Sequence, residues 1–347
     1  MGYIYFTNNN IDTQAQQEPI KVEIIKILAS DCSMCTQIDP LVDSLKTLNI
    51  EITSQQQYEF YDEEAKALIK EFTIKKLPTF IIKGDEKEFK RAGLDQLGEI
   101  LDDTLVFTNL QPPYLDLTTG TIAGKVDVIA ITRDSCTKCY NISQVISQMK
   151  GMGIYVNSVQ SLESASLDGD KLVKQYGITK IPTLIFSKEI GSYKAISDAW
   201  KEVGIIADDG KYVLTSVPPP YTEVGQNNLR GLVTVTKIVD ASCTECYDPA
   251  VHLQILQGLG VYVAEEKTVD IGTLQGKSLI EKYRITKVPT IILSSEASLY
   301  PGIKQIWQDV GTTESDGTLV FREMAAIKDA QYRNLEAAQI ENTTSNS

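Results

Sequence analysis

The sequence has little that would bind nucleic acid or cross a membrane. Its 347 residues contain 33 lysines and arginines against 46 aspartates and glutamates, a net charge of −13 at pH 7. Because negative charge repels phosphate, nucleic acid and anionic membrane surfaces are poor partners. No stretch approaches the roughly eighteen uninterrupted apolar residues of a membrane-spanning helix. The first ten residues also lack the basic and apolar segments of a signal peptide.

Cysteine and histidine are scarce as well. The chain has six cysteines and one histidine, and the cysteines occur only as three Cys-x-x-Cys pairs: Cys32 with Cys35, Cys136 with Cys139, and Cys243 with Cys246. Such short loops are no disulfide framework for a small secreted protein, and the cysteine count alone leaves the compartment open.

Each pair is followed at a fixed distance by a hydrophobic residue, a proline and a threonine. The proline lies 46 residues after the first cysteine in all three copies, as Pro78, Pro182 and Pro289. A spacing kept to the residue indicates that the two ends meet in space. Successive first cysteines lie 104 and 107 residues apart, which is the size of a small domain, so the sequence predicts three tandem domains.

Hydrophobic periodicity predicts the same order of elements in each repeat. A first strand is predicted at 22–28, 126–131 and 233–239; a helix follows the cysteines, as over Ile38–Leu48; and a second strand is predicted at 153–156 and 260–263. A second helix leads to the proline, a strand such as 183–186 follows it, and a last helix contains Trp200 or Trp307. This order predicts α/β domains, each a mixed β-sheet flanked by helices.

The predicted boundaries follow from the repeat. They are an N-terminal arm or edge strand at 1–17, domains at 18–115, 116–222 and 223–330, and a polar C-terminal tail at 331–347. Pro112-Pro113 and Pro218-Pro219-Pro220 are expected as stiff connectors between domains.

The cysteine pairs indicate thiol chemistry. A thiol attacks a disulfide only as the thiolate, which the N-terminus of a helix stabilises. We therefore expect the first cysteines (Cys32, Cys136 and Cys243) at helix starts as attacking thiols, and the second cysteines (Cys35, Cys139 and Cys246) as resolving thiols. Lys138 lies within the second pair and Arg133 just upstream of it, whereas Glu245 lies within the third pair. This difference predicts the lowest thiol pKa for Cys136 and the highest for Cys243, with Cys32 between them.

These motifs resemble those of the thioredoxin family, which joins Cys-x-x-Cys to a hydrophobic-cisPro-Thr turn. Residues 176–184, Tyr-Gly-Ile-Thr-Lys-Ile-Pro-Thr-Leu, match that family closely. The resemblance implies cis prolines beside the cysteines and substrate binding by the residues around them: Leu77 and Pro78, Ile181 and Pro182, Val288 and Pro289. One departure is that the acid which the family places six residues before the first cysteine is replaced by Lys26, Ala130 and Lys237.

The sequence therefore resembles tandem thioredoxin-fold oxidoreductases such as protein disulfide isomerases. This resemblance implies thiol–disulfide exchange with cysteines of other proteins, an unknown redox partner, no metal, and no cofactor beyond the chain's own dithiols. One alternative is a zinc ion shared by two pairs, since each repeat offers two cysteines and only the third adds a histidine, His252. The other is a structural, self-assembling extracellular protein built of thioredoxin-like repeats.

The start of the chain bears on location. Gly2–Thr7 resembles Gly210–Thr215 near the end of the second repeat, so we expect a further repeat or an anchor upstream, or else an edge strand that packs on the first domain. With the oxidoreductase interpretation, this favours an extracytoplasmic or cell-surface location, with the cytoplasm as the alternative.

Overall fold

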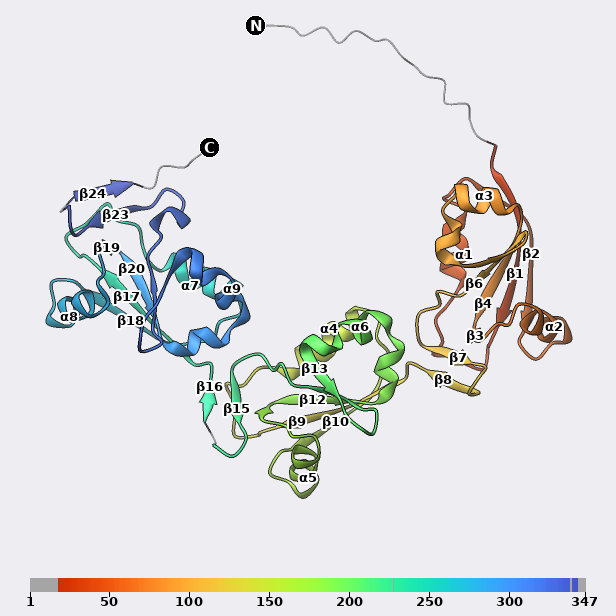
Figure 1. Ribbon diagram of the computed structural model, residues 1–347, viewed down its shortest axis with the longest axis horizontal. Coiled ribbons are helices and arrows are strands. Elements are labelled where there is room, and N and C mark those ends of the chain that lie inside the picture. The colour runs from red at the N-terminus through yellow and green to blue at the C-terminus, as the bar shows by residue number, and fades with distance from the viewer. Residues whose placement is uncertain (1–17, 227, 338, 343–347) are drawn as a thin grey trace, which may run out of the picture. The chain divides into compact units, whose positions relative to one another are not determined.

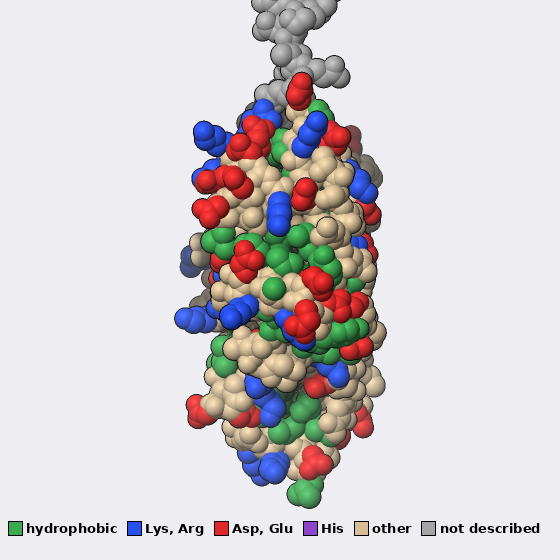
Figure 2. Space-filling view, turned by 90° about the vertical axis from the view of Figure 1, so that its right-hand side faces the viewer, with side chains coloured by type: hydrophobic (Ala, Val, Ile, Leu, Met, Phe, Trp, Pro, Cys, Tyr) green, Lys and Arg blue, Asp and Glu red, His purple; other side chains and the backbone are tan. Residues whose placement is uncertain are grey.

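The computed structural model describes residues 18–342 except 227 and 338, and shows one α/β arrangement repeated three times (Figure 1). The predicted arm at 1–17 and the last residues of the predicted tail, 343–347, lie outside the described residues. In the described part of the chain, no helix has the length and apolar character needed to cross a membrane. On the face shown in Figure 2, acidic and basic side chains are interspersed.

The first repeat has a five-stranded sheet in the order β2-β1-β4-β6-β5 and a three-stranded sheet in the order β3-β7-β8. Its strands are β1 (Ile20–Leu28), β2 (Ile50–Glu59), β3 (Lys76–Leu77), β4 (Thr79–Lys83), β5 (Gly98–Leu101), β6 (Thr104–Phe107), β7 (Tyr114–Asp116) and β8 (Thr121–Ala123). Its helices are α1 (Asp39–Leu45), α2 (Glu63–Glu71), α3 (Glu86–Arg91) and the short 3₁₀ helix η1 (Leu94–Leu97).

The second repeat has the same two sheets, ordered β10-β9-β12-β14-β13 and β11-β15-β16. Its strands are β9 (Val126–Thr132), β10 (Val156–Glu163), β11 (Lys180–Ile181), β12 (Thr183–Phe186), β13 (Gly204–Ile206), β14 (Tyr212–Leu214), β15 (Tyr221–Glu223) and β16 (Leu229–Arg230). Its helices are α4 (Ile142–Gly151), α5 (Leu167–Gln175), η2 (Lys188–Ser192) and α6 (Lys194–Val203).

The third repeat follows the same plan, with sheets ordered β18-β17-β20-β22-β21 and β19-β23-β24. Its strands are β17 (Val233–Val239), β18 (Val263–Asp270), β19 (Lys287–Val288), β20 (Thr290–Leu293), β21 (Gly311–Thr313), β22 (Leu319–Phe321), β23 (Gln331–Asn334) and β24 (Gln339–Asn342). Its helices are α7 (Val251–Gly258), α8 (Leu274–Tyr283), η3 (Ser295–Leu299), α9 (Pro301–Val310) and η4 (Met324–Ala326).

Helices cover both faces of each five-stranded sheet. In the first repeat α1 and α3 lie on one face and α2 on the other (Figure 1). Val22 and Ile24 of β1 pack with Val42 of α1 in one core cluster, whereas Ile25 and Ile27 pack with Ala65 of α2 in another. A strand buried on both faces needs a nearly continuous run of buried residues, and β1 shows this in its second half, where Ile24, Ile25, Lys26 and Ile27 are all buried. The predicted α/β architecture of three mixed sheets flanked by helices is confirmed.

In the second and third repeats the second strand lies later than predicted. β10 and β18 begin at Val156 and Val263, where the predicted strands end. Both are edge strands whose side chains are mostly exposed, so they carry no apolar alternation that a sequence could reveal. The helix predicted over Ile38–Leu48 is also shorter, because α1 ends at Leu45.

The proline-rich segments are not free connectors. Each leads into a hairpin that pairs with the short strand ahead of the repeated proline: β7–β8 with β3, and β15–β16 with β11. Residues 331–342, predicted as a polar tail, form the corresponding hairpin β23–β24 on β19. We call these three hairpins the capping hairpins. The predicted boundaries after residues 115 and 222 fall within β7 and β15.

A glycine ends each of the first two capping hairpins and leads into the first strand of the next repeat. Gly124 donates its N–H to Glu189 Oε2 (2.9 Å), and Tyr193 Oη donates to the Gly124 carbonyl (2.8 Å). Gly231 is held in the same way: its N–H donates to Glu296 Oε2 (2.5 Å), and its carbonyl accepts from Tyr300 Oη (2.6 Å). Both glycines have positive φ, +80° and +86°.

Candidate redox sites

The fixed 46-residue spacing does bring the cysteines and prolines together. The peptide bonds Leu77–Pro78, Ile181–Pro182 and Val288–Pro289 are cis. Cys32, Cys35 and Pro78 line one cleft of about 210 Å³. In the second repeat, Cys139 Sγ lies 3.9 Å from the carbonyl oxygen of Ile181, the residue before the cis proline.

All six cysteines are paired as disulfides. The Cα–Cα distances are 5.4, 5.4 and 5.5 Å for Cys32–Cys35, Cys136–Cys139 and Cys243–Cys246. Among the described residues, no group of three histidine, cysteine or acidic side chains is placed to hold a metal ion.

The predicted position of the first cysteine at a helix start is wrong. Each first cysteine lies in a turn and donates its N–H to the carbonyl three residues earlier, over 2.8 Å for Cys32, 2.9 Å for Cys136 and 3.0 Å for Cys243. The helices begin only at Asp39, Ile142 and Val251, after the second cysteine of each pair. Local charge and burial, rather than a helix terminus, must therefore decide how readily each thiolate forms.

Sequence signals for these later helix starts were present. Asp39-Pro40 opens α1, with the proline in the first turn where a missing N–H costs nothing. Asn141 Oδ1 accepts from Ser143 N (3.1 Å) ahead of α4, and Asp248 Oδ1 accepts from Ala250 N (2.8 Å) ahead of α7. The Asn141 contact is a side-chain cap of the kind that marks a helix start. The Asp248 contact closes the turn just ahead of α7, whose own N-cap, Ala250, has no side-chain cap.

The capping hairpin contacts each site on two sides, which the motif analysis missed. The residue after the second cysteine donates its N–H to the hairpin: Thr36 to Pro113 O (2.8 Å), Tyr140 to Pro220 O (2.7 Å) and Tyr247 to Gln331 O (2.9 Å). The residue before the cis proline pairs with the hairpin strand in the same register each time, Leu77 with Leu115, Ile181 with Thr222, and Val288 with Arg333.

A repeated Lys–Tyr contact supports this pairing. Lys76 Nζ lies 4.7 Å from the centre of the Tyr114 ring, Lys180 Nζ 4.6 Å from that of Tyr221, and Lys287 Nζ 5.4 Å from that of Tyr332. These are cation–π distances. The lysines precede the hydrophobic-Pro motif and two of the tyrosines follow the proline runs, so this recurrence was the signal that could have revealed the hairpins.

The three disulfides differ in burial. The first is the most enclosed: Cys32 is 8% and Cys35 5% exposed, and both pack in an apolar cluster with Leu77 and Leu115. The cysteines of the second and third pairs are half-buried. In the second repeat, Cys139 Sγ lies 3.6 Å from Thr222 Oγ1 of the capping hairpin.

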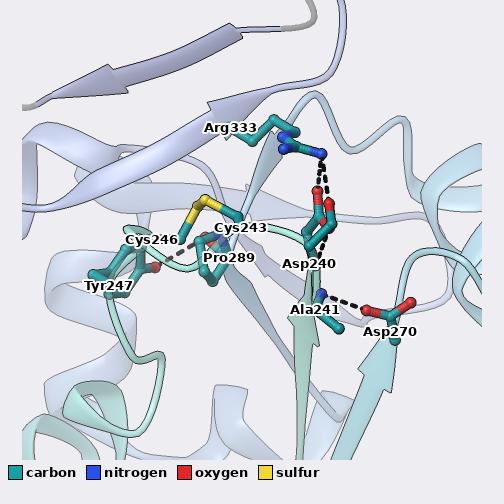
Figure 3. Close-up of a disulfide and its surroundings, with 9 residues drawn as sticks. Asp240, Ala241, Cys243, Cys246, Tyr247, Asp270, Pro289 and Arg333 are labelled. Atoms are coloured by element: carbon teal, nitrogen blue, oxygen red, sulfur yellow. Dashed lines mark hydrogen bonds and ion pairs between the residues drawn. A yellow bond between two sulfur atoms is a disulfide. The ribbon is translucent and has the colours of Figure 1, made fainter.

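The third site has a charged pair beside it (Figure 3). Arg333 of the capping hairpin forms an ion pair with Asp240, with Nη1 and Oδ2 2.5 Å apart, and donates to Ser242 Oγ (3.0 Å). Ser242 precedes Cys243 and donates its N–H (2.9 Å) and hydroxyl (2.6 Å) to Asp240 Oδ1. Asp240 is buried, with a side chain 5% exposed, so the ion pair satisfies a carboxylate that would otherwise lie buried without a counter-charge.

A pair made of the partly buried Tyr247 and the buried His252 lies on the other side of the third site. Tyr247 follows Cys246, and its hydroxyl donates to the Pro289 carbonyl (3.0 Å) and lies 3.0 Å from His252 Nε2. His252 is 4% exposed and lies in the core of the third repeat rather than on the helix surface. Desolvation lowers the pKa of His252 to about 4 and raises the pKa of Tyr247. Both side chains are therefore neutral at pH 7.

These features decide the fold. The three repeats are thioredoxin-like. Each thioredoxin-like repeat places a Cys-x-x-Cys disulfide after the first strand of a mixed sheet and against a cis proline that opens a later strand of the same sheet.

Comparison with known proteins adds distant likenesses. No protein-family model and no curated protein matches the chain. Among solved structures, the alkylhydroperoxide reductase AhpF of Enterococcus faecalis is 15% identical, with 49% of this chain and 82% of that chain covered and a TM-score of 0.16. Human ERp44 is 12% identical over 83% of both chains, with a TM-score of 0.15. ERdj5 is 11% identical over 81% of this chain and 39% of its own, also with a TM-score of 0.15.

Proposed function

We propose that this protein is a thiol–disulfide oxidoreductase that exchanges disulfides with cysteines of other proteins. The observation that carries the proposal is the meeting of Cys-x-x-Cys and cis proline in all three repeats, with half-buried sulfurs in two of them. In the oxidising direction, a substrate thiolate attacks one sulfur of the pair and forms a mixed disulfide. A second substrate thiolate then displaces the protein's sulfur, so the substrate loses two electrons and the protein keeps a dithiol.

The roles of the site residues belong to the same proposal. Cys32, Cys136 and Cys243 act as attacking thiols in the reducing direction, and Cys35, Cys139 and Cys246 as resolving thiols. Pro78, Pro182 and Pro289 form the surface that a substrate meets beside the sulfurs. The backbone of Leu77, Ile181 and Val288 is paired with the capping hairpins, so a substrate strand can add there only after the hairpin has moved.

The proposal also covers the location of the protein and its redox partner. We place the protein outside the cytoplasm or at the cell surface, where disulfides persist, with its own dithiols as its redox groups and a separate partner to recharge them. A structural role for the first repeat is a second candidate, favoured by the enclosure of Cys32–Cys35 in an apolar cluster.

Disulfide exchange on a protein substrate tests the function. With glutathione as the terminal reductant, the full chain is expected to accelerate reduction of a folded disulfide protein, while a variant with all six cysteines changed to serine has no effect. Circular dichroism of that variant checks that it folds. The proposal fails if the serine variant matches the native chain, or if the native chain is no faster than an equimolar short Cys-x-x-Cys peptide.

A further inference from the structure

We infer that the capping-hairpin residue opposite the residue before each cis proline sets the reactivity of the neighbouring disulfide. This residue is Leu115 in the first repeat, Thr222 in the second and Arg333 in the third. The three sites therefore form a series in which the first is the least reactive and the third the most oxidising. The use of such a series rests on the proposed function, but the series itself is a property of the isolated chain.

The three residues are structurally equivalent. Each lies on the second strand of its three-stranded sheet, in register with the residue before the cis proline. The residue three before the first cysteine changes with it: Ala29 accompanies Leu115, Arg133 accompanies Thr222, and Asp240 accompanies Arg333. In the first repeat both members of the pair are apolar and belong to one core cluster, and in the third they form an ion pair. In the first and third repeats the capping-hairpin residue and the residue three before the first cysteine therefore match each other in polarity.

In the first repeat this pair packs apolar side chains against the disulfide. The charged groups beside this cleft are Lys26 and Asp39, which neutralise each other in an ion pair (2.8 Å). Leu115 packs in the cluster that holds Cys32 and Cys35, which are 8% and 5% exposed. Burial in apolar surroundings raises a thiol pKa and disfavours the charged leaving sulfur of disulfide exchange. An incoming thiolate also has little exposed sulfur to reach. Both effects slow reduction of the first pair.

In the third repeat the pair supplies charge. The Arg333 guanidinium donates to Ser242 Oγ, next to Cys243, while it neutralises the buried Asp240 carboxylate. Without Arg333, that carboxylate would oppose a thiolate on Cys243. The other titratable groups around the site are Asp270, which accepts from Ala241 N (2.6 Å), the neutral Tyr247 and His252, and Lys287 over the Tyr332 ring. Arg333 is therefore the group that neutralises the charge of Asp240 and so removes its opposition to a thiolate on Cys243. A stabilised thiolate is a better leaving group when the disulfide is attacked.

The second repeat is intermediate. Thr222 is buried and offers a hydroxyl 3.6 Å from Cys139 Sγ, a weak hydrogen bond without a net charge. The charged residues just before Cys136 are the half-buried Arg133 and the exposed Asp134, and Glu163 accepts from Asp134 N (2.8 Å), so the cation of this site has carboxylates beside it. This series replaces the ranking predicted from Lys138 and Glu245. Both of those side chains are exposed, so solvent and salt screen them, whereas Asp240 is buried and Arg333 partly so.

The test uses the full chain in three forms, each with one cysteine pair kept and the other four cysteines changed to serine. Equilibration with glutathione redox buffers gives the fraction of each pair reduced, and iodoacetamide alkylation against pH gives each thiol pKa. We expect the third pair to be the most easily reduced, the second intermediate and the first the hardest, with steps of about tenfold in the equilibrium constant, the size of one pKa unit.

Arg333→Met in the form that keeps the third pair is expected to make that pair about tenfold harder to reduce. Adding Asp240→Asn should restore most of the loss, because it removes the carboxylate that Arg333 neutralises. The matched control is Arg322→Met, which removes an arginine of similar exposure that pairs with Glu314 in the same repeat. In the first repeat, Leu115→Thr is expected to make the first pair easier to reduce.

Three equal pairs, or an Arg333→Met effect no larger than that of Arg322→Met, would overturn the inference. Near-ultraviolet circular dichroism would show whether Arg333→Met unfolds the third repeat. If it does, Arg333→Lys, which keeps the positive charge, is measured instead. A redox potential close to the native value then supports the inference, and a shift as large as that of Arg333→Met overturns it. The readouts need no protein substrate, so a chain that lacks oxidoreductase activity but shows the series would contradict only the proposed function.

Discussion

Acidification from pH 7 to pH 4 is expected to cost the third repeat about 3 kcal/mol of unfolding free energy through His252 alone. Desolvation in the core lowers the pKa of this imidazole to about 4, whereas an unfolded histidine titrates near 6.5. Between pH 6.5 and pH 4, His252 therefore binds a proton in the unfolded chain but not in the folded repeat. Stability falls as the pH drops from about 6.5 to about 4 and is independent of His252 above pH 7.

Because the chain has a single histidine, the contribution of His252 to the pH dependence can be measured without interference from other histidines. Trp200 lies in the second repeat and Trp307 in the third, so a Trp200→Phe variant reports on the third repeat by Trp307 fluorescence. Urea unfolding of this variant at several pH values should show the loss between pH 6.5 and 4. His252→Phe is the control and should flatten the pH dependence in that window whatever its effect on stability at pH 7. An unchanged slope in the control would contradict the assignment.

Replacing Gly231 by alanine is expected to destabilise the second capping hairpin by about 3 kcal/mol or more. Its φ of +86° disfavours any side chain, and a Cβ would lie 2.3 Å from Pro219 Cβ, closer than real side chains approach. Strain in the left-handed region costs about 1–2 kcal/mol and overpacking about 1–3 kcal/mol more.

Gly225→Ala is the matched control. Gly225 lies in the same hairpin at φ +82°, but a Cβ there would meet nothing within 4 Å, so only the backbone strain applies. Hydrogen exchange of the Tyr140 amide, which donates to Pro220 O, reports whether the hairpin still covers the second site. Exchange should rise much more in Gly231→Ala than in Gly225→Ala. Equal effects would mean that the contact with Pro219 does not hold the hairpin.

The sequence was informative where residues far apart had to meet. The fixed spacing between the cysteine pair and the proline predicted that the two meet, and in the second repeat Cys139 Sγ lies 3.9 Å from the carbonyl oxygen before Pro182. The β-branched runs predicted the buried central strands, because both patterns reflect packing that tolerates no shift. The α/β architecture followed from these two signals.

The edge strands, the helix starts and the capping hairpins have weaker signals in the sequence. The edge strands β10 and β18 are exposed, so their residues obey no apolar alternation. The helix start predicted at the cysteines is too early because apolar spacing says little about where a helix begins. The proline in the first turn of α1 and the side-chain cap of Asn141 are better signals of a helix start. The capping hairpins have strands of two to four residues, too short for periodicity, and their pairing with β3, β11 and β19 depends on backbone contacts that every residue type can make.

The course of the chain gives the capping hairpins a mechanical consequence. The only covalent path from the first repeat to the second runs through β7 and β8, and β7 pairs with β3 by two residue pairs, whereas nine pairs join β1 and β2. Tension along the polypeptide would therefore separate β7 from β3 at a lower force than it separates β1 from β2. The Cys32–Cys35 disulfide, enclosed at rest, would become reducible under a modest pull, so stretching would act on the redox chemistry of this chain before it acts on its folded core.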